Sequence, residues 1–462
     1  MTVTEQLGSA DVERLRSELS GRLVQPGEPD YDGLRQIMMG GLDPRPALIA
    51  CVEGAPDVAR VIAFARESGL PLAVRCGGHS AAAHSTVDGG IVLDLRAMKA
   101  IEVDVETRTA WAEAGLTAAE YTAAVEAYGL LTGFGDTGSV GIGGLTLGGG
   151  IGYLSRKFGL TIDSLLAAEL VTADGELLRV DETSHPELFW AIRGGGGNFG
   201  VVTRFKYRLH ALPQTYGGML VLPATPQTVA GFLALSEAAP DELTTIGNVM
   251  NCPPMPFVPE EHHGKVVILG MLCYAGDVEA GERAVVPFRA LAEPLADMVQ
   301  AQPYSGMFPP EEGEEEYHPT AIARNLFVEG IGEAEASAIV ERLEASDASL
   351  RAVQIRVHGG AIARVPNEAT AFAHRREPIM VNVACFYEGE DDRPRRQRWV
   401  DEVVADLQQG LAGAYVNFVG DEGEAGVRAA YPPATYRRLS EIKARYDPDN
   451  LFRRNQNVPA AA

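Results

Sequence analysis

The chain has 462 residues, of which 46% are hydrophobic and 22% charged, a composition typical of a large globular protein. Its formal net charge of -24 argues against nucleic acid as a partner, because phosphate backbones attract basic surfaces. No apolar run is long enough to span a membrane, and the acidic N-terminal stretch lacks the pattern of a signal peptide. Five scattered cysteines predict reduced thiols and a cytoplasmic location.

The first third of the chain predicts alternating helices and strands. Apolar spacing indicates a helix over residues 57–68 and a strand over 72–75. A second helix is expected over 117–128, with Thr117 as its N-cap and Glu120 three residues later. Further strands are expected over 91–95, 101–105 and 109–113.

Hairpin signals follow in the next segment. Asp174-Gly175 separates expected strands over 168–172 and 177–180, and this dipeptide suits a hairpin turn. Ser184 is expected to cap a short helix over 186–193, which a strand over 201–209 follows. The mixture of hairpins and crossover helices predicts an α+β fold.

Beyond Pro213 the glycine clusters end and a second domain is expected. Long strand-like runs occupy 266–274, 352–359 and 379–387, and a helix is predicted over 333–345. The nearly all-acidic run 311–316 is expected to form a solvated loop, and the tail 436–458 a helix, a turn and an amide-rich end.

Two glycine-dense segments carry the chemical signal. The turn Arg75-Cys76-Gly77-Gly78-His79-Ser80 ends at a histidine, and Val140–Gly152 contains seven glycines in thirteen residues. Glycine lets backbone N–H groups approach a ligand closely, so two such segments suggest backbone wrapped around a phosphate-bearing cofactor.

Other common sites fit the sequence poorly. Gly195–Gly200 matches the dinucleotide fingerprint G-x-G-x-x-G, but here it follows a helix and leads into a strand, which is the reverse of the required context. Neither the His79/His84 spacing nor the adjacent pair His262-His263 is a metal-ligand pattern, so no metal is expected.

The turn 75–80 and the segment 89–95 after it closely resemble the flavin-attachment region of the vanillyl-alcohol-oxidase/para-cresol-methylhydroxylase superfamily. Residues 140–152 and 187–200 agree with the same superfamily. The segments 415–418 and 446–452 resemble the closing part of its berberine-bridge-enzyme branch, so the likeness runs from about residue 45 to 458.

This resemblance implies an α+β architecture with two parts. A two-part FAD-binding domain of mixed sheets and helices would cover residues 45–213, and the C-terminal segment 416–462 would return to it. Residues 214–415 would form a substrate-binding domain with an antiparallel sheet flanked by helices.

The resemblance also implies FAD bonded through His79 to the flavin 8α carbon, a reaction for which neutral imidazole is a competent nucleophile. A histidine that hydrogen-bonds beside noncovalent FAD is the alternative. Many relatives add a second bond through a cysteine, where this chain has Thr137, so a single attachment is expected. The further cofactor-binding residues that the resemblance implies are Arg75, Cys76, Gly77, Gly78, Ser80, Thr137, Val140, Gly141, Gly143, Gly144, Gly148, Gly149, Gly150, Gly152, Asn198, Gly200, Val201 and Asn417.

The implied reaction oxidises a small alcohol, sugar or amine by hydride transfer to flavin N5, with O2 as acceptor and H2O2 as product. Tyr415 matches a tyrosine that acts as base or substrate orienter, and a base near neutrality needs a lowered pKa. The alternative for Tyr415 is a half-buried structural tyrosine. Asn382 stands where relatives have a glutamate or glutamine; it is expected to hydrogen-bond the substrate or Tyr415.

Three alternatives stay open at this stage. One is a dehydrogenase of the same fold with a non-oxygen acceptor, and another is a flavin-binding protein whose active site has decayed, which Asn382 alone favours. His374 could be structural or reach the substrate cavity. A small-molecule substrate is expected, with neither nucleic acid nor a membrane as partner; the oligomeric state is not predicted.

Overall fold

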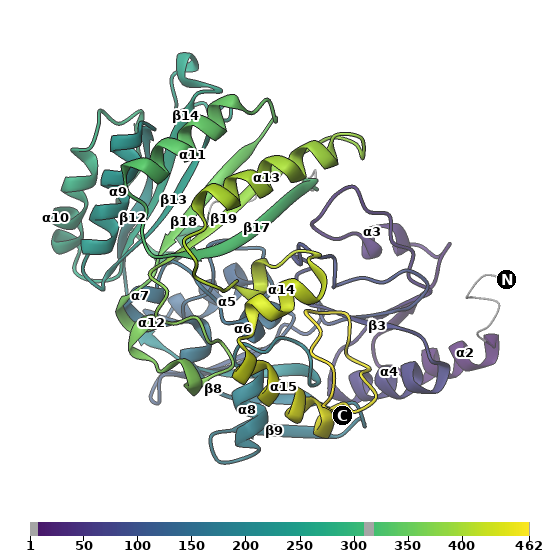
Figure 1. Ribbon diagram of the computed structural model, residues 1–462. Helices are drawn as coiled ribbons and strands as arrows, with labels where there is room; N and C mark the ends of the chain where they lie inside the picture. Colours follow the sequence, from purple (N-terminus) through teal and green to yellow (C-terminus); the bar gives the residue numbers. More distant parts are fainter. Residues whose placement is uncertain (1–7, 309–317, 462) are drawn as a thin grey trace.

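The computed structural model describes residues 8–308 and 318–461, so the expected acidic loop 311–316 lies outside the described residues. Figure 1 shows a long antiparallel sheet with its helices in one half of the molecule and smaller sheets in the other. The C-terminal helices return to the half that contains the smaller sheets. None of the described helices is long and apolar enough to cross a membrane.

The first sheet has four strands in the order β1-β2-β4-β3, of which the last three run parallel. Its strands are β1 (Arg22–Val24), β2 (Leu48–Cys51), β3 (Leu72–Arg75) and β4 (Ile91–Asp94). Helix α4 (Ala55–Ser68) connects β2 to β3, which confirms the predicted helix. It buries Val58, Val61, Ile62 and Ala65 and ends at Gly69, whose φ of 68° is left-handed.

The second sheet has five antiparallel strands in the order β5-β6-β10-β8-β9. Its strands are β5 (Ile101–Asp104), β6 (Thr109–Glu113), β8 (Leu165–Val171), β9 (Leu177–Asp181) and β10 (Val201–Arg208). The predicted hairpin is confirmed, with Gly175 at φ +80° in its turn. A small separate sheet pairs β7 (Leu130–Leu131) with β11 (His210–Ala211).

Of the two N-caps predicted from the sequence, one is confirmed and one is wrong. Helix α5 (Ala118–Glu126) begins with the expected capping box of Thr117 and Glu120. The expected cap of α8 (Pro186–Ile192) by Ser184 is wrong, because His185 is the N-cap residue and no side chain caps this helix. Asp181 accepts hydrogen bonds from the Ser184 N–H and from Thr183, so Ser184 belongs to the turn after β9.

The third sheet is antiparallel and has eight strands. These strands are β12 (Thr215–Pro223), β13 (Leu243–Asn251), β14 (Val266–Tyr274), β15 (Ala296–Asp297), β16 (Gln300–Gln302), β17 (Ala321–Val328), β18 (Arg351–Val357) and β19 (Ile379–Phe386). One face packs into an apolar core with helices α9 (Pro226–Ala238), α10 (Val278–Arg289), α11 (Glu333–Ala345) and α13 (Arg393–Leu407). The opposite face of the sheet turns toward the other half of the molecule (Figure 1).

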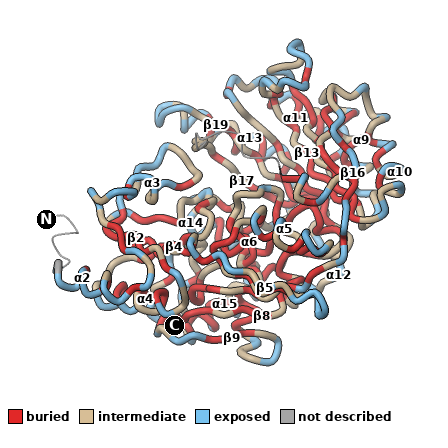
Figure 2. The backbone as a smooth tube through the Cα atoms, turned by 180° about the vertical axis from the view of Figure 1, so that it is seen from behind, coloured by how far each residue is buried: buried red, intermediate tan, exposed pale blue. Residues whose placement is uncertain are grey.

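The remaining helices are short or terminal. They are α2 (Ser9–Glu18), α3 (Tyr31–Arg35), α6 (Ile142–Gly148), α7 (Ser155–Phe158), α12 (Gly360–Arg364), α14 (Gly423–Ala430) and α15 (Pro433–Tyr446), with 3-10 turns η1 (Thr161–Asp163), η2 (Glu260–His262), η3 (Tyr304–Met307), η4 (Asn367–Ala369) and η5 (Val416–Phe418). A second large core contains the smaller sheets and also α15, through Leu439 and Ile442. Figure 2 shows this burial as red tube in both halves. The predicted α+β class is confirmed, with one mixed sheet, smaller antiparallel sheets and one large antiparallel sheet flanked by helices.

Candidate functional site

The attachment turn and the glycine run lie backbone against backbone. A Cβ atom on Gly77 would overlap the backbone nitrogen of Gly141, and a Cβ atom on Gly141 would overlap that of Gly77. Gly144 differs, because a Cβ atom there would have no described atom within 4 Å. Gly77 and Gly141 therefore allow the chain to pack on itself, whereas Gly144 leaves space for a ligand.

Arg75 lies behind the turn in a buried ion pair. Its Nη2 donates to Asp94 Oδ2 at 2.7 Å and its Nη1 to the Gln36 carbonyl at 3.2 Å. Burial opposes ionisation of Asp94, but Arg75 and Arg96 outweigh it and the pKa of this carboxyl is lowered. Arg75 thus fixes where the turn begins, rather than presenting its charge at the surface.

His79 at the end of the turn is half-buried, and three other predicted cofactor-binding residues have defined surroundings. Burial raises the pKa of the Cys76 thiol to about 12, so this thiol stays protonated and is a poor second anchor for a cofactor. Ser80 Oγ accepts a hydrogen bond from the His84 N–H at 3.2 Å. Thr137 is exposed, and its hydroxyl cannot form the thioether that a cysteine forms.

Tyr415 connects the tail to the glycine run. Its hydroxyl oxygen accepts hydrogen bonds from the Gly150 N–H at 3.0 Å and from Asn417 Nδ2 at 2.8 Å. Asn417 Nδ2 also donates to the Leu145 carbonyl. Burial raises the pKa of Tyr415 and outweighs these donors and the charge of Arg356. The lowered pKa that a tyrosine base requires is therefore not what this environment produces.

A row of amide side chains crosses the sheet face above Tyr415. Asn382 on β19 lies opposite Asn325 on β17 and Gln354 on β18, and Gln354 lies opposite Asn248 on β13. Asn325 Oδ1 accepts from the Tyr415 N–H at 2.6 Å, which fixes the side of the sheet that the row occupies. Asn382 Oδ1 is buried and has no hydrogen-bond partner among the described residues.

Arg356 is a site residue that sequence reasoning missed. Its guanidinium donates to Asp136 Oδ2 at 2.6 Å and to Gln354 Oε1 at 2.8 Å, and its Cζ lies 5.1 Å from the centre of the Phe418 ring. Only 3% of the residue is exposed. Arg356 thus joins the amide row to the loop that carries Thr137. No local motif marks it, since its hydrogen-bond partners are more than 200 residues away in sequence or on its own strand.

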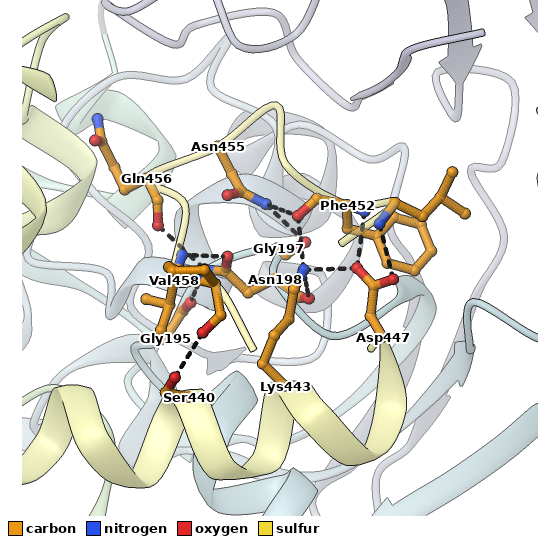
Figure 3. Close-up of polar contacts among 12 residues, drawn as sticks. Gly195, Gly197, Asn198, Ser440, Lys443, Asp447, Phe452, Asn455, Gln456 and Val458 are labelled. Carbon is orange, nitrogen blue, oxygen red and sulfur yellow. Dashed lines mark hydrogen bonds and ion pairs between the residues drawn. The ribbon is translucent and has the colours of Figure 1, made fainter. Parts of the chain in front are cut away.

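Asn198 holds the C-terminal tail against a third glycine cluster, residues 194–197 (Figure 3). Its Nδ2 donates to the carbonyls of Gly195 and Gln456, and its Oδ1 accepts from the Val458 N–H at 3.0 Å. Both the nitrogen and the oxygen of the Asn198 side chain are used in these hydrogen bonds. The role of Asn198 here is therefore to hold the surrounding backbone segments in place. Val201, also predicted at the cofactor, begins β10 opposite Val171, and Gly200 just before it packs closely on Leu170 and Val171.

A buried lysine completes this attachment. Lys443 Nζ donates to the carbonyls of Asn198 and Phe452 and to Asp447 Oδ2 at 2.6 Å (Figure 3). Burial lowers the pKa of Lys443 although Asp447 opposes this effect. Asp447 in turn accepts from the backbone N–H groups of Leu451 and Phe452. The segment 446–452 therefore has a structural role: together with Lys443 it forms a lock, meaning a set of buried polar contacts that holds the tail in place. Lys443 was not predicted from the sequence.

The His374 ring stacks on Phe327, and its nitrogens are engaged by groups outside the amide row. Its Nε2 faces the carbonyls of Ala429 and Ala430 at 3.2 and 3.1 Å, and its Nδ1 lies 3.4 Å from Glu377 Oε1. These contacts attach α14 to the segment before β19. They support the structural alternative for this histidine.

The residues next to His79 suit a polar cofactor. His84, Ser85 and Thr86 have buried side-chain nitrogen or oxygen atoms without hydrogen-bond partners among the described residues. Buried polar groups are rarely left unpaired in a folded protein. Together with the space at Gly144, they fit a ligand such as FAD that supplies both hydrogen-bond donors and acceptors.

Comparison with protein families matches two segments of the chain. Residues 46–181 match the family of FAD binding domains, and residues 414–459 match the family described as berberine and berberine like. The chain is also similar to (R)-6-hydroxynicotine oxidase of Paenarthrobacter nicotinovorans, with 30% identity over 456 residues. This alignment covers 95% of this chain and 97% of that protein.

Solved structures show the same arrangement. Crystalline 6-hydroxy-D-nicotine oxidase from Arthrobacter nicotinovorans matches 95% of this chain and 98% of its own, with a TM-score of 0.84 and 28% identity. Xylooligosaccharide oxidase from Myceliophthora thermophila, at 23% identity and a TM-score of 0.84, covers 98% of this chain and 100% of its own and shares the fold. The chain therefore belongs to the FAD-linked oxidoreductases that join an FAD-binding domain to a berberine-like C-terminal segment.

Proposed function

We propose that this oxidoreductase carries FAD bonded covalently to His79 alone, and that it oxidises a small alcohol, sugar or amine with O2 as acceptor. The half-buried position of His79 at the end of the glycine turn supports the bond. Thr137 supports a single attachment, because this position offers no thiol. The oxidase names of the relatives support the acceptor and the range of substrates.

The observation that carries the proposal is the junction at Tyr415. This residue touches the glycine run through Gly150 and the amide row through Asn325. Tyr415, at the end of the predicted substrate side (214–415), is therefore one residue at which that side meets the predicted cofactor side (45–213 with the tail 416–462). When bound, the flavin supplies an acceptor for a hydride from the substrate carbon.

The substrate side offers orientation rather than a strong base. Asn382 has an unpaired amide oxygen among the described residues, which suits a substrate O–H or N–H group. Burial keeps Tyr415 a neutral phenol near pH 7, so we assign it to orienting the substrate. A substrate amine that is already neutral needs no base for hydride transfer, whereas an alcohol must pass its O–H proton to solvent water.

A cytoplasmic location is part of the proposal. All five cysteines are unpaired in the structure, and Cys252, Cys273 and Cys385 are buried. Free thiols of this kind persist in a reducing compartment.

The test is a substrate screen under nitrogen, read from the visible absorption of the flavin. Bleaching by an alcohol, sugar or amine would show catalysis, and recolouring on admission of air with formation of H2O2 would show that O2 is the acceptor. A bleached flavin that stays reduced in air would contradict O2 and point to another acceptor. A flavin that no member of the panel bleaches would contradict the proposed substrate classes.

A further inference from the structure

A small polar cavity lies between the end of the glycine run and the large antiparallel sheet. One half of the molecule lines it with residues 151–152 and with α7, and the other half with β13, the end of β18 and α12. Helices α7 and α12 lie side by side here (Figure 1). The cavity has a free volume of about 10 Å³, which is room for one water-sized species.

Three of the lining residues have buried polar atoms without a hydrogen-bond partner among the described residues. These atoms are Arg156 Nε, Thr244 Oγ1 and both ring nitrogens of His358. Each of the three residues is more than nine-tenths buried. Buried polar groups are rarely left unpaired, so we expect the cavity to hold a species that bonds to them.

Strand register and one direct contact bring these three residues together. Ile246 on β13 pairs with Arg356 on β18. Thr244 and His358 each lie two residues further along these neighbouring strands, toward the same end of the sheet. Side chains two positions apart share a face, so both lie on the face that carries the amide row. Arg156 reaches this end of the sheet from α7, and its Nη1 donates to the His358 carbonyl.

The charge around the cavity is positive. Its lining includes Arg156 and Arg356 but neither aspartate nor glutamate. Arg356 is paired with Asp136, whereas Arg156 donates to two backbone carbonyls and forms no ion pair with a described carboxylate. Asp241 acts on Arg156 from a distance and is itself paired with Arg364. The charge of Arg156 therefore has no close counterion in the described parts of the chain.

The neutral groups of the cavity add hydrogen-bond donors to this charge. Burial, and then Arg356, lowers the pKa of His358 to about 4, against the charge of Glu377. The imidazole is therefore neutral near pH 7 and can donate one N–H group. The Thr244 hydroxyl can donate a second hydrogen bond, and Arg156 Nε a third. Donors gathered around an unneutralised cation suit an anion better than a neutral molecule.

We propose that this cavity binds one monovalent anion of halide size, chloride being the probe, with Arg156 as its charged contact. The centre of a water-sized sphere can move within the cavity, so a halide ion, which is slightly larger in radius, also fits. The anion would join α7 in one half of the molecule to β13 and β18 in the other. It would therefore stabilise the packing of the two halves, a role beyond the proposed oxidation.

The test compares chloride with gluconate, an anion too large for the cavity, at equal ionic strength and about pH 7.5, where His358 is neutral. Urea unfolding of the flavoprotein as isolated, followed by circular dichroism, gives the ratio of folded to unfolded protein. Chloride at ten times its dissociation constant should raise this ratio about tenfold over gluconate. The net charge of -24 disfavours general attraction of chloride to the surface, so the gain reports a specific site.

Variants locate the anion. Arg156→Met should abolish the gain from chloride, and Arg156→Lys, which keeps the charge, should retain part of it. Thr244→Val is nearly isosteric and should raise the chloride concentration needed for the same gain about tenfold, so it decides the question if Arg156→Met fails to fold. Arg208→Met, at an exposed position, is the matched control and should respond as the parent does.

Two results would overturn the proposal. Equal stability of the wild type in chloride and in gluconate at every concentration would mean that the cavity holds ordered water only. A chloride gain that Thr244→Val, or a folded Arg156→Met, keeps in full would mean that the anion binds elsewhere.

Discussion

Backbone lies on one side of Tyr415 and amide side chains lie on the other. The cofactor side is built from contiguous stretches whose glycines let chain pack on chain, as Gly77 and Gly141 do. The substrate side draws Asn248, Asn325 and Asn382 from three separate strands. The cofactor side tolerates few substitutions at these glycines, because a new side chain would meet backbone that cannot move aside. The substrate side leaves side chains free to vary, so it is where substrate preference can change without loss of the fold.

The largest expected effect concerns the lock that holds the tail on the cofactor side. Lys443→Met should destabilise the protein by about 3–5 kcal/mol, because it leaves the carboxylate of Asp447 buried without its cation. Urea unfolding followed by circular dichroism measures this loss. Arg437→Met, at an exposed position of the same helix, is the control. Equal midpoints for the two variants would contradict a lock at Lys443.

Two glycine variants separate packing from ligand space. Gly77→Ala should lower the free energy of unfolding by about 3 kcal/mol, since the new Cβ would overlap backbone that cannot rotate away. Gly144→Ala should leave the apoprotein as stable as the parent or slightly more stable, because the position is helical and open. It should nevertheless weaken FAD binding. If both variants unfold at the parental midpoint, the backbone contact described for Gly77 is wrong.

Acid should loosen the substrate side through His358. Burial, and then Arg356, lowers the pKa of this histidine to about 4 from an ordinary value near 6.5. The unfolded chain therefore binds the proton first, so stability is complete above about pH 6.5 and falls as the pH drops toward 4. Between pH 7.5 and 5 the loss from this residue should be about 2 kcal/mol. A His358→Phe variant should show a shallower acid dependence, and an identical curve would refute the assignment.

Tyr415→Phe should slow flavin reduction about tenfold by removing one orienting hydrogen bond. Because burial raises the pKa of Tyr415, the wild-type rate should stay level from about pH 7 to 9. Single-turnover reduction under nitrogen across this range is the measurement. A rate that climbs steadily with pH and loses that climb in the variant would instead identify the tyrosine as the base.

The parts that sequence reasoning predicted share one property, which is that their signal is local. The helix α4, the capping box at Thr117 and the hairpin around Gly175 each depend on residues within a few positions of one another. The glycine turn is local too, and so is its resemblance to a flavin-attachment segment. The error at Ser184 was also local, since Asp181 uses the backbone N–H of that residue in a turn before the helix begins.

The parts that were missed depend on contacts across the fold. Arg356 is defined by Asp136, which lies 220 residues earlier, and by Gln354 beside it on the same strand face. The amide row exists only because strand registers align Asn325, Asn382 and Gln354. Lys443 resembles any helix-surface lysine until the tail folds over it. Alternation along each strand was the available signal, but it does not tell which strands are neighbours.

The central claim is the covalent bond at His79, and the most direct test is the absorption spectrum of acid-precipitated, washed protein. The wild type and a Thr137→Ala variant should keep yellow flavin in the pellet, and His79→Ala should release it entirely to the supernatant. Flavin released from wild-type protein, or retained by His79→Ala, would contradict the account.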